Sequence, residues 1–202
     1  MDEAGLISGA QRGDLDSFNT LVLAHQDSVF NTALRILGDE DLAADAVQET
    51  FLSAFRSLRT FRGGSFRAWL LRTATNACYD ELRRKKRRPG VPLEPETPDG
   101  DDVESPRWMA DASMSPEQRA EADELQDAIQ HCLDGLPTDF RAVVVLADLQ
   151  GLDYVEVALA ARVPLGTVKS RLARARLRLR ECLQGFGELL PTAFRLQEER
   201  ST

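Results

Sequence analysis

Two blocks of basic side chains carry the most informative chemistry in this chain. Residues 56–88 hold eleven Arg or Lys against two acids, and residues 162–180 hold seven against none, although the whole protein has a net charge of −8. Guanidinium and ammonium groups bind phosphate oxygens, and an ordinary solvated helix face would place acids one turn away from them. We therefore expect two separate surfaces that bind nucleic acid.

The sequence offers no residues arranged for catalysis or for a metal. It has no nucleophile–base set, no Gly-rich phosphate loop and no carboxylate cluster with metal-ligand spacing. Cys78, Cys132 and Cys182 are too far apart for a CxxC-type site. Cys132 and Cys182 fall at near-apolar helix positions, so we expect buried free thiols. We expect no enzyme, no cofactor and no metal.

The elements that position these blocks are all predicted to be helices. An apolar stripe at helical spacing ends at Gly38, a second covers residues 47–58, and no segment is a convincing strand. Gly63-Gly64 then breaks the chain, and Ser65 is a ready N-cap for an aromatic helix. The spacing of Phe66 and Trp69 on that helix favours core packing over contact with bases.

The second half of the chain shows helix start signals of its own. Ser115-Pro116 places a serine cap before a proline, with Gln118 at the capping-box position. Pro137-Thr138 opens another helix that Gly151 breaks, and Asp153-x-x-Glu156 caps a short one. The chain is therefore predicted to be all-α.

A proline-rich acidic segment divides the chain. Residues 89–114 contain five prolines and seven acids, a composition that does not bury a core. As a coil the segment would span about 28 Å, and fully extended up to roughly 85 Å. We predict an N-terminal domain (1–88), this linker (89–114), a C-terminal domain (115–184) and a tail (185–202). No apolar run suits a membrane span and the N-terminus lacks signal-peptide features, so we expect a cytoplasmic protein.

Residues 153–180 have the proportions of a helix–turn–helix. A short helix, a turn at residues 162–166 and a long basic helix follow each other. Four apolar residues form one inward face of the long helix: Val168, Leu172, Ala175 and Leu179. The opposite side presents Lys169, Ser170 and Arg174, which at the front of such a helix reach base edges in the major groove.

Two stretches resemble one protein family. Asp45-Ala-Val-Gln-Glu-Thr-Phe-Leu-Ser-Ala-Phe-Arg, Thr60-Phe-Arg-Gly-Gly-Ser-Phe-Arg-Ala-Trp-Leu and the basic run after Asn76 resemble region 2 of the extracytoplasmic-function (group 4) sigma factors of bacterial RNA polymerase. Tyr154-Val-Glu-Val-Ala and Val163-Pro-Leu-Gly-Thr-Val-Lys-Ser-Arg-Leu-Ala-Arg-Ala-Arg resemble region 4.2. The chain departs from the family at Ala161-Arg162, where members commonly have a Leu-Gly turn, so Arg162 must adopt the backbone angle that glycine usually supplies.

The resemblance implies roles for residues of the N-terminal domain. Asp45, Gln48 and Glu49 would dock on a coiled coil of the polymerase β′ subunit. The loop Phe61, Arg62, Gly63, Gly64 and Ser65 would form a pocket for a flipped base of the −10 promoter element. Asn76, Tyr79, Arg83 and Arg84 would meet the edge of the −10 duplex.

The C-terminal domain would recognise the −35 element and contact the polymerase β flap. By matching position, Lys169, Ser170 and Arg174 would face bases, while Thr167, Arg171 and Arg176 would hold the DNA backbone. Only a linker separates the two regions, without the region 3 domain of primary sigma factors, which is typical of the extracytoplasmic-function group. The resemblance thus implies an alternative sigma factor that responds to a stress or envelope signal and is held by an anti-sigma factor.

A second interpretation stays open from the residues alone. A helix–turn–helix repressor or activator that dimerises on operator DNA without polymerase would explain residues 153–180. It would leave the aromatic and acidic motifs of residues 45–88 unused. A pull-down of core RNA polymerase separates the two hypotheses. An adaptor that binds only proteins does not account for the two basic blocks.

Overall fold

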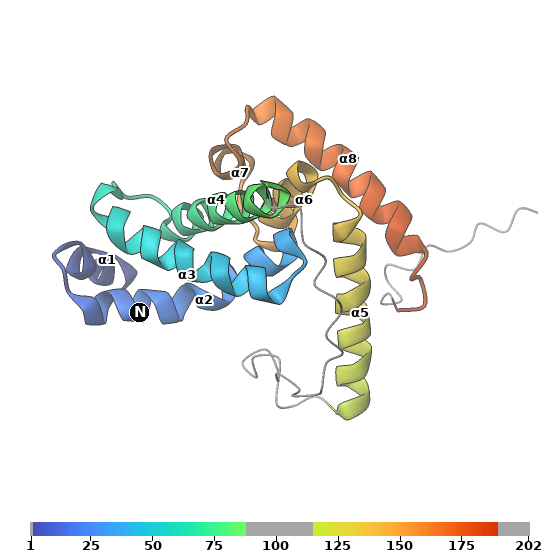
Figure 1. The fold of residues 1–202 in the computed structure, drawn as a ribbon, viewed down its shortest axis with the longest axis horizontal. Helices are drawn as coiled ribbons and strands as arrows, with labels where there is room; N and C mark the ends of the chain where they lie inside the picture. Colours follow the sequence, from blue (N-terminus) through green and yellow to red (C-terminus); the bar gives the residue numbers. More distant parts are fainter. Residues whose placement is uncertain (1, 88–114, 190–202) are drawn as a thin grey trace, which may run out of the picture.

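A computed structural model of the protein describes residues 2–87 and 115–189, and all its regular elements are helices (Figure 1). Because these ranges contain no strand, the all-α prediction is confirmed. The predicted linker at 89–114 and most of the predicted tail lie outside the described residues. Within the described ranges, none of the helices combines the length and the apolar character needed to cross a bilayer.

The N-terminal half contains α1 (Glu3–Gln11), α2 (Leu15–Leu37), α3 (Glu40–Ser57), the short 3₁₀ helix η1 (Leu58–Thr60) and α4 (Phe66–Arg87). Local chemistry sets these bounds. Gly38 ends α2 at a φ of 69°, a left-handed conformation that suits glycine. Asp39 then caps α3 by accepting from Leu42 N. The Ser65 hydroxyl accepts from Ala68 N, so the predicted cap of α4 is confirmed.

The core of this half lies between α2, α3 and α4. Phe66 is 2% exposed, and its ring stacks on Trp69 at 5.5 Å between centroids, which confirms the predicted core packing. Helix α1 was not predicted. It braces the chain after α3, because the Gln11 side-chain amide donates to both Leu58 O and Phe61 O.

The C-terminal half contains α5 (Pro116–Asp134), α6 (Thr138–Val144), the π-helical turn η3 (Val145–Leu149), α7 (Tyr154–Ala161) and α8 (Leu165–Gln184). The helix predicted from residue 137 therefore widens into a π turn before Gly151. Asp153 and Glu156 form the predicted reciprocal capping box. The side chain of Gln118, proposed for a second capping box, lies outside the described residues.

The turn before α8 adopts the backbone that the sequence comparison with the family required. Arg162 has a φ of 54°, so an arginine occupies a left-handed position that usually favours glycine. After it, α8 buries its predicted inward face: Val168, Leu172 and Ala175 are at most 1% exposed. These residues pack on α6 and α7 and fix the rotation of α8 about its axis.

One cysteine prediction is wrong. Cys132 and Cys182 are not free thiols but form a disulfide that joins α5 to α8 across 50 residues of sequence. Their sequence positions did not reveal the pair, because only tertiary packing brings the two helices into contact. Cys78 is free and buried, and its burial raises the pKa of the thiol to about 12.

The two halves pack against each other. Helix α7 lies against α4, and α6 and η3 contact α2 (Figure 1). Buried apolar residues of both halves form one continuous cluster. The predicted linker is long enough to let the two halves separate, but in this structure they are in contact.

Candidate functional site

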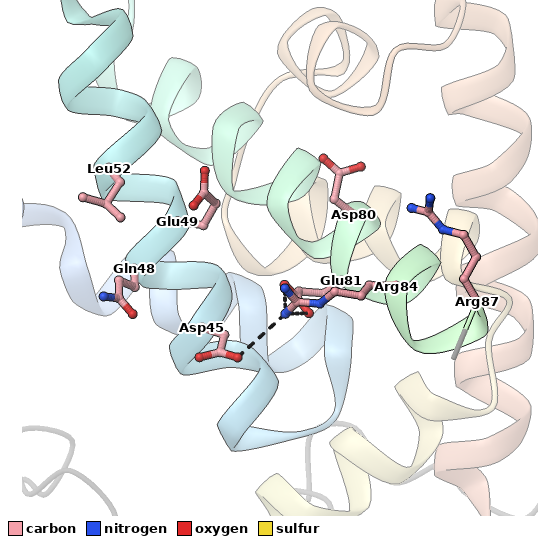
Figure 2. Close-up of a pocket in the computed structure, with 8 residues that line it drawn as sticks. All are labelled: Asp45, Gln48, Glu49, Leu52, Asp80, Glu81, Arg84 and Arg87. Atoms are coloured by element: carbon pink, nitrogen blue, oxygen red, sulfur yellow. Dashed lines mark hydrogen bonds and ion pairs between the residues drawn. The ribbon is translucent and has the colours of Figure 1, made fainter. Parts of the chain in front are cut away.

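A groove of about 830 Å³ lies between α3 and α4 (Figure 2). Asp45, Gln48 and Glu49, the three residues expected to bind polymerase, line its α3 side together with Leu52. All three are exposed, because the helix turns the small residues Ala43, Ala46 and Thr50 toward the core. The structure thus places the expected docking residues on one accessible surface.

The opposite wall of the groove comes from α4 and mixes acids with arginines. Asp80, Glu81, Arg84 and Arg87 line it. The Arg84 guanidinium lies 2.5 Å from a Glu81 carboxylate oxygen and 3.9 Å from one of Asp45. Arg84 was expected to meet −10 DNA, but in this structure it faces α3 and the groove.

Apolar side chains border the acids of α3. Leu52 and Phe55 are each 44% exposed, although Phe55 also contacts Phe18 edge-on at 5.0 Å. Exposed carboxylates steer a basic partner, and neighbouring apolar side chains supply area that is buried on contact. This surface suits a basic, amphipathic partner helix.

The loop expected to hold a flipped base projects from the start of α4. Arg62, Gly63, Gly64 and Ser65 are exposed, and both glycines have positive φ, 100° and 88°. Phe61 differs, because its half-buried ring packs on Phe66 and Trp69, each 5.5 Å away between centroids. Phe61 is therefore a fixed wall beneath an exposed loop. Such an aromatic wall can stack an unpaired base.

Asn76, Tyr79 and Arg83 lie elsewhere on α4. Asn76 is ten residues beyond Phe66, a distance of about 15 Å along the helix axis. The three residues line a second pocket of about 290 Å³, whose other side comes from the C-terminal half and includes Asp139, Arg162 and Arg171. The structure thus separates all three from the 61–65 loop; Asn76 and Tyr79 are half-buried beside the C-terminal half, while the Arg83 side chain is 68% exposed.

The pKa of Tyr79 is affected by the C-terminal half that packs beside it. The side chain is half-buried, and its burial raises the pKa of the phenol to about 12. The negative charge of Asp139 contributes in the same direction, and the positive charge of Arg171 opposes it. Both charges belong to the C-terminal half, so the pKa of Tyr79 depends on the packing of the two halves.

Three of the residues expected to read the −35 element are accessible. Lys169, Ser170 and Arg174 are exposed on the side of α8 opposite its buried face. The Ser170 hydroxyl donates to Thr167 O at 3.0 Å, and Thr167 itself is half-buried near the helix start. Arg174 lies four residues after Ser170 and five after Lys169 on a helix whose other side is buried, and such a helix can present these side chains to the major groove.

The other two expected DNA-binding arginines are held within the protein. Arg171 pairs with Asp139 at 2.7 Å. Arg176 donates Nε and Nη2 to the two carboxylate oxygens of Asp148, at 2.9 and 2.6 Å. The hydrogen bonds that Arg176 makes with Asp148 and with Tyr154 raise its pKa above the ordinary value. In this structure the two arginines hold α8 to α6 and η3.

Sequence reasoning missed the contacts between the halves. Arg67, which lies in the quoted region 2 stretch without an assigned role, donates hydrogen bonds to Gln150, 83 residues away. Asp139 and Asp148 looked like ordinary acids of an acidic segment. A helical pattern identifies the face of one helix but not the partner that covers it.

Comparisons with known proteins identify the family of both halves of the chain. The models of Sigma-70 region 2 and of Sigma-70 region 4 match residues 21–88 and 126–179. The chain is 40% identical over 169 residues to the ECF RNA polymerase sigma factor SigE of Mycolicibacterium smegmatis, covering 84% of the chain and 62% of that protein, less than two thirds of its length. It is 35% identical over 176 residues to the ECF RNA polymerase sigma-E factor of Salmonella typhimurium, covering 85% and 88%. Among solved structures, the sigma factor RpoE in complex with the anti-sigma factor NepR from Bartonella quintana has a TM-score of 0.60 at 27% identity, covering 82% of the chain and 96% of the match.

Proposed function

The chain belongs to the extracytoplasmic-function (ECF) sigma factors of the sigma-70 family, and we propose that it binds core RNA polymerase and directs it to a specific set of promoters. One observation carries the proposal: the chain matches both region 2 and region 4, in the family's order, on its N-terminal and C-terminal halves. A transcription factor of this kind selects DNA and needs no catalytic residues of its own. We propose that it is located in the cytoplasm, where RNA polymerase transcribes.

The α3–α4 groove is the proposed docking surface for polymerase. Its exposed Asp45, Gln48 and Glu49 and its apolar border at Leu52 and Phe55 suit the β′ coiled coil. Acids at the rim of such an interface speed association and fix orientation. The C-terminal half would contact the β flap, as region 4 does in the family.

Residues 61–65, Asn76, Tyr79 and Arg83 are the proposed −10 reader. The exposed glycine loop above the Phe61 ring offers space for one extruded base, and the amide of Asn76 can hydrogen-bond to a base edge. Opening a duplex costs a few kcal/mol per base for unstacking, which such a pocket offsets only after the base has left the stack. We assign Arg84 a weaker role, because it faces the α3 acids.

Lys169, Ser170 and Arg174 are the proposed base-reading residues of α8 for the −35 element. Arg or Lys donors recognise guanine edges in the major groove, and each good contact contributes about 1–3 kcal/mol of discrimination. Thr167, Arg171 and Arg176 remain proposed backbone contacts. The two arginines would then exchange Asp139 and Asp148 for phosphate oxygens, or orient α8 through those acids.

We also propose an anti-sigma factor as a partner. The support is the Bartonella quintana structure, a sigma factor bound to an anti-sigma factor, which covers most of this chain. The domain limits at residues 88, 114 and 184 are also proposed; the matched ranges, 21–88 and 126–179, lie within them.

Co-purification with core polymerase tests the proposed function. We expect the wild-type chain to form a stable complex with core enzyme. Asp45→Lys and Glu49→Lys should weaken that complex at least tenfold, because they reverse the charge that meets a basic partner. Asp123→Lys, which changes an exposed acid of α5, is the matched control and should leave binding unchanged. If the wild-type chain does not bind core polymerase but binds duplex DNA tightly alone, the protein is a helix–turn–helix regulator instead.

A further inference from the structure

Helix α1 lies beside the chain that leads from α3 into the 61–65 loop (Figure 1). The Sigma-70 region 2 model matches residues 21–88, so α1 precedes the matched range. The Asp2 carboxylate caps the helix by accepting from a backbone N–H of its first turn at 3.1 Å. The buried Gly9 and Ala10 pack α1 against the rest of the N-terminal half. A formed helix with no role assigned by the family match therefore lies next to the proposed flipped-base loop.

The end of α1 holds the first residue of that loop through one side-chain amide. Gln11 Nε2 donates to Leu58 O at 3.1 Å and to Phe61 O at 3.0 Å. The amide nitrogen carries two hydrogens, so one group can satisfy both carbonyls. Leu58 O also accepts from Phe61 N at 3.0 Å, which closes η1. The Gln11 amide thus fixes the carbonyl groups at both ends of η1, directly before the exposed part of the loop.

The start of α1 reaches the aromatic side chains behind the loop by another route. Glu3 Oε1 lies 3.0 Å from His25 Nε2, and the His25 ring lies 5.4 Å from the Phe66 ring between centroids. Phe66 in turn packs edge-on against Phe61 at 5.5 Å. Glu3 and Gln11 are eight residues apart, which is about 12 Å along the helix axis. The two ends of α1 therefore support the Phe61–Phe66 pair at two separate points.

The exposed part of the loop depends on how its two ends are held. A Cβ atom added at Gly63 or Gly64 would meet no atom within 4 Å outside its chain neighbours, and both glycines have positive φ. On the α4 side, the Ser65 hydroxyl accepts from a backbone N–H of α4 at 3.1 Å. On the α3 side, the corresponding contact is the Gln11 amide on Phe61 O. Because unrestrained glycines have the largest conformational freedom, loss of this contact would leave the loop less ordered.

We propose that α1 positions the 61–65 loop for capture of an extruded base, and that Gln11 is the positioning residue. This inference rests on the proposed function, because it concerns the pocket assigned there to the −10 element. A loop that already has the required shape offsets more of the cost of unstacking than a loop that must first be ordered. Gln11 does not touch DNA in this proposal. It acts through Phe61 O, so it affects opening of the promoter and not docking on polymerase.

Three variants separate this role from general stability. Gln11→Met keeps a side chain of similar length but has no hydrogen-bond donor. Ser8→Ala is the matched control on the same helix, because the exposed Ser8 hydroxyl accepts from Arg12 and not from the loop. Thr32→Ala is the comparison for stability, since its buried hydroxyl donates to Ser28 O within α2. Circular dichroism and thermal unfolding establish the temperature at which all three remain folded, and the assays are run there.

Hydrogen–deuterium exchange of the full chain measures the anchor itself. We expect the backbone amides of residues 61–65 to exchange about tenfold faster in Gln11→Met than in the wild type, because η1 and the loop lose a partner outside their own segment. Ser8→Ala should exchange like the wild type. Thr32→Ala should affect exchange in α2 more than exchange at residues 61–65.

The rate of promoter opening measures the consequence. Holoenzyme made from core polymerase and each full-length variant is mixed with a promoter that the wild-type holoenzyme transcribes. We expect Gln11→Met to slow the appearance of permanganate-reactive −10 thymines about fivefold, with unchanged affinity for core polymerase and for the closed promoter. On a template with a pre-melted −10 bubble, the difference in transcription should shrink to less than about twofold. Ser8→Ala and Thr32→Ala should open the promoter at the wild-type rate.

Equal opening rates for Gln11→Met and the wild type would overturn the inference. Unchanged exchange at residues 61–65 in Gln11→Met would also overturn it, because Gln11 would then not hold the loop. An equally large loss of opening rate in Thr32→Ala would show that stability alone explains both variants. A failure of the proposed function has a different signature, since the wild-type chain would then bind no core polymerase. The exchange measurement needs no polymerase, so the two ideas can fail separately.

Discussion

Reduction of the disulfide between α5 and α8 should destabilise the C-terminal half strongly. Cys132 and Cys182 close a loop of 50 residues that contains α6, η3 and α7. In the chain-entropy description, a cross-link over about 50 residues stabilises the folded state by about 4 kcal/mol at 25 °C, because it removes conformations from the unfolded chain. For a helical domain of under 100 residues, a loss of 1 kcal/mol lowers Tm by roughly 4–8 °C. Reduction should therefore lower the melting temperature of this half by roughly 15–30 °C.

Differential scanning calorimetry with and without a phosphine reductant measures this change. The double variant Cys132→Ser/Cys182→Ser is the control: it should melt near the reduced wild type and should not respond to reductant. Alkylation followed by mass spectrometry identifies the bond itself. We expect one reactive thiol in unfolded, unreduced protein and three after reduction.

The reasoning fails if unreduced, unfolded protein already shows three reactive thiols. It also fails if the oxidised and reduced proteins melt within about 3 °C of each other, since the loop entropy would then not act on this domain. Such a bond is of interest in a protein proposed to work in the cytoplasm, where thiols are usually kept reduced. The stability of the C-terminal half, whose α8 is proposed to read the −35 element, would depend on redox conditions.

Three further predictions concern single residues. Arg174→Ala should cost about 1–3 kcal/mol of discrimination at one −35 base pair, measured as relative transcription from single-base promoter variants; equal losses at every promoter would show that the proposed reading face is misplaced. Arg176→Ala and Asp148→Ala should each lower transcription from all promoters by a similar factor of up to about five, since exposed ion pairs contribute up to about 1 kcal/mol. A larger loss for Arg176→Ala than for Asp148→Ala would indicate a direct contact between Arg176 and phosphate. Burial raises the pKa of the Cys78 thiol to about 12, so the neutral thiol stabilises the fold fully below the ordinary pKa of about 8.5, and this contribution is lost as the pH rises toward 12. Cys78 should therefore resist thiol reagents at pH 8 until denaturant is added. Rapid labelling of the native protein would contradict its burial.

Melting of the −10 element provides another test of the site. Asn76→Ala should leave core binding and −35 protection intact while permanganate reactivity of −10 thymines falls, because a pocket for an extruded base acts only after opening. Exchange of residues 61–65 for a Gly-Ser sequence should act alike. A template with a pre-melted −10 bubble should restore much of the transcription. If core binding is lost instead, or the bubble gives no rescue, these residues support the fold and do not open DNA.

Local signals in the sequence predicted much of the fold. The Asp153–Glu156 capping box, the glycine that ends α2 and the buried face of α8 depend on residues within about one or two turns of each other. The departure at Arg162 was also informative, since its position required a left-handed backbone and the structure has one. Such features need no knowledge of the rest of the chain.

Contacts between distant segments could not be predicted in this way. The disulfide joins helices 50 residues apart, and Gln150 meets Arg67 across 83 residues. The resemblance implied that Arg84 meets −10 DNA, but it did not reveal that the Arg84 guanidinium lies 3.9 Å from Asp45 of α3. Helix α1 was missed because a nine-residue helix with little apolar patterning gives a weak periodic signal.

Run-off transcription of fragmented genomic DNA from the host, followed by sequencing of RNA 5′ ends, tests the central claim most directly. Core polymerase with this chain should produce a discrete set of 5′ ends that core polymerase alone does not produce. The DNA upstream of these ends should share one −10 motif and one −35 motif at fixed spacing. An unchanged set of 5′ ends on addition of the chain, with the polymerase shown to be active using another sigma factor, would contradict the assignment.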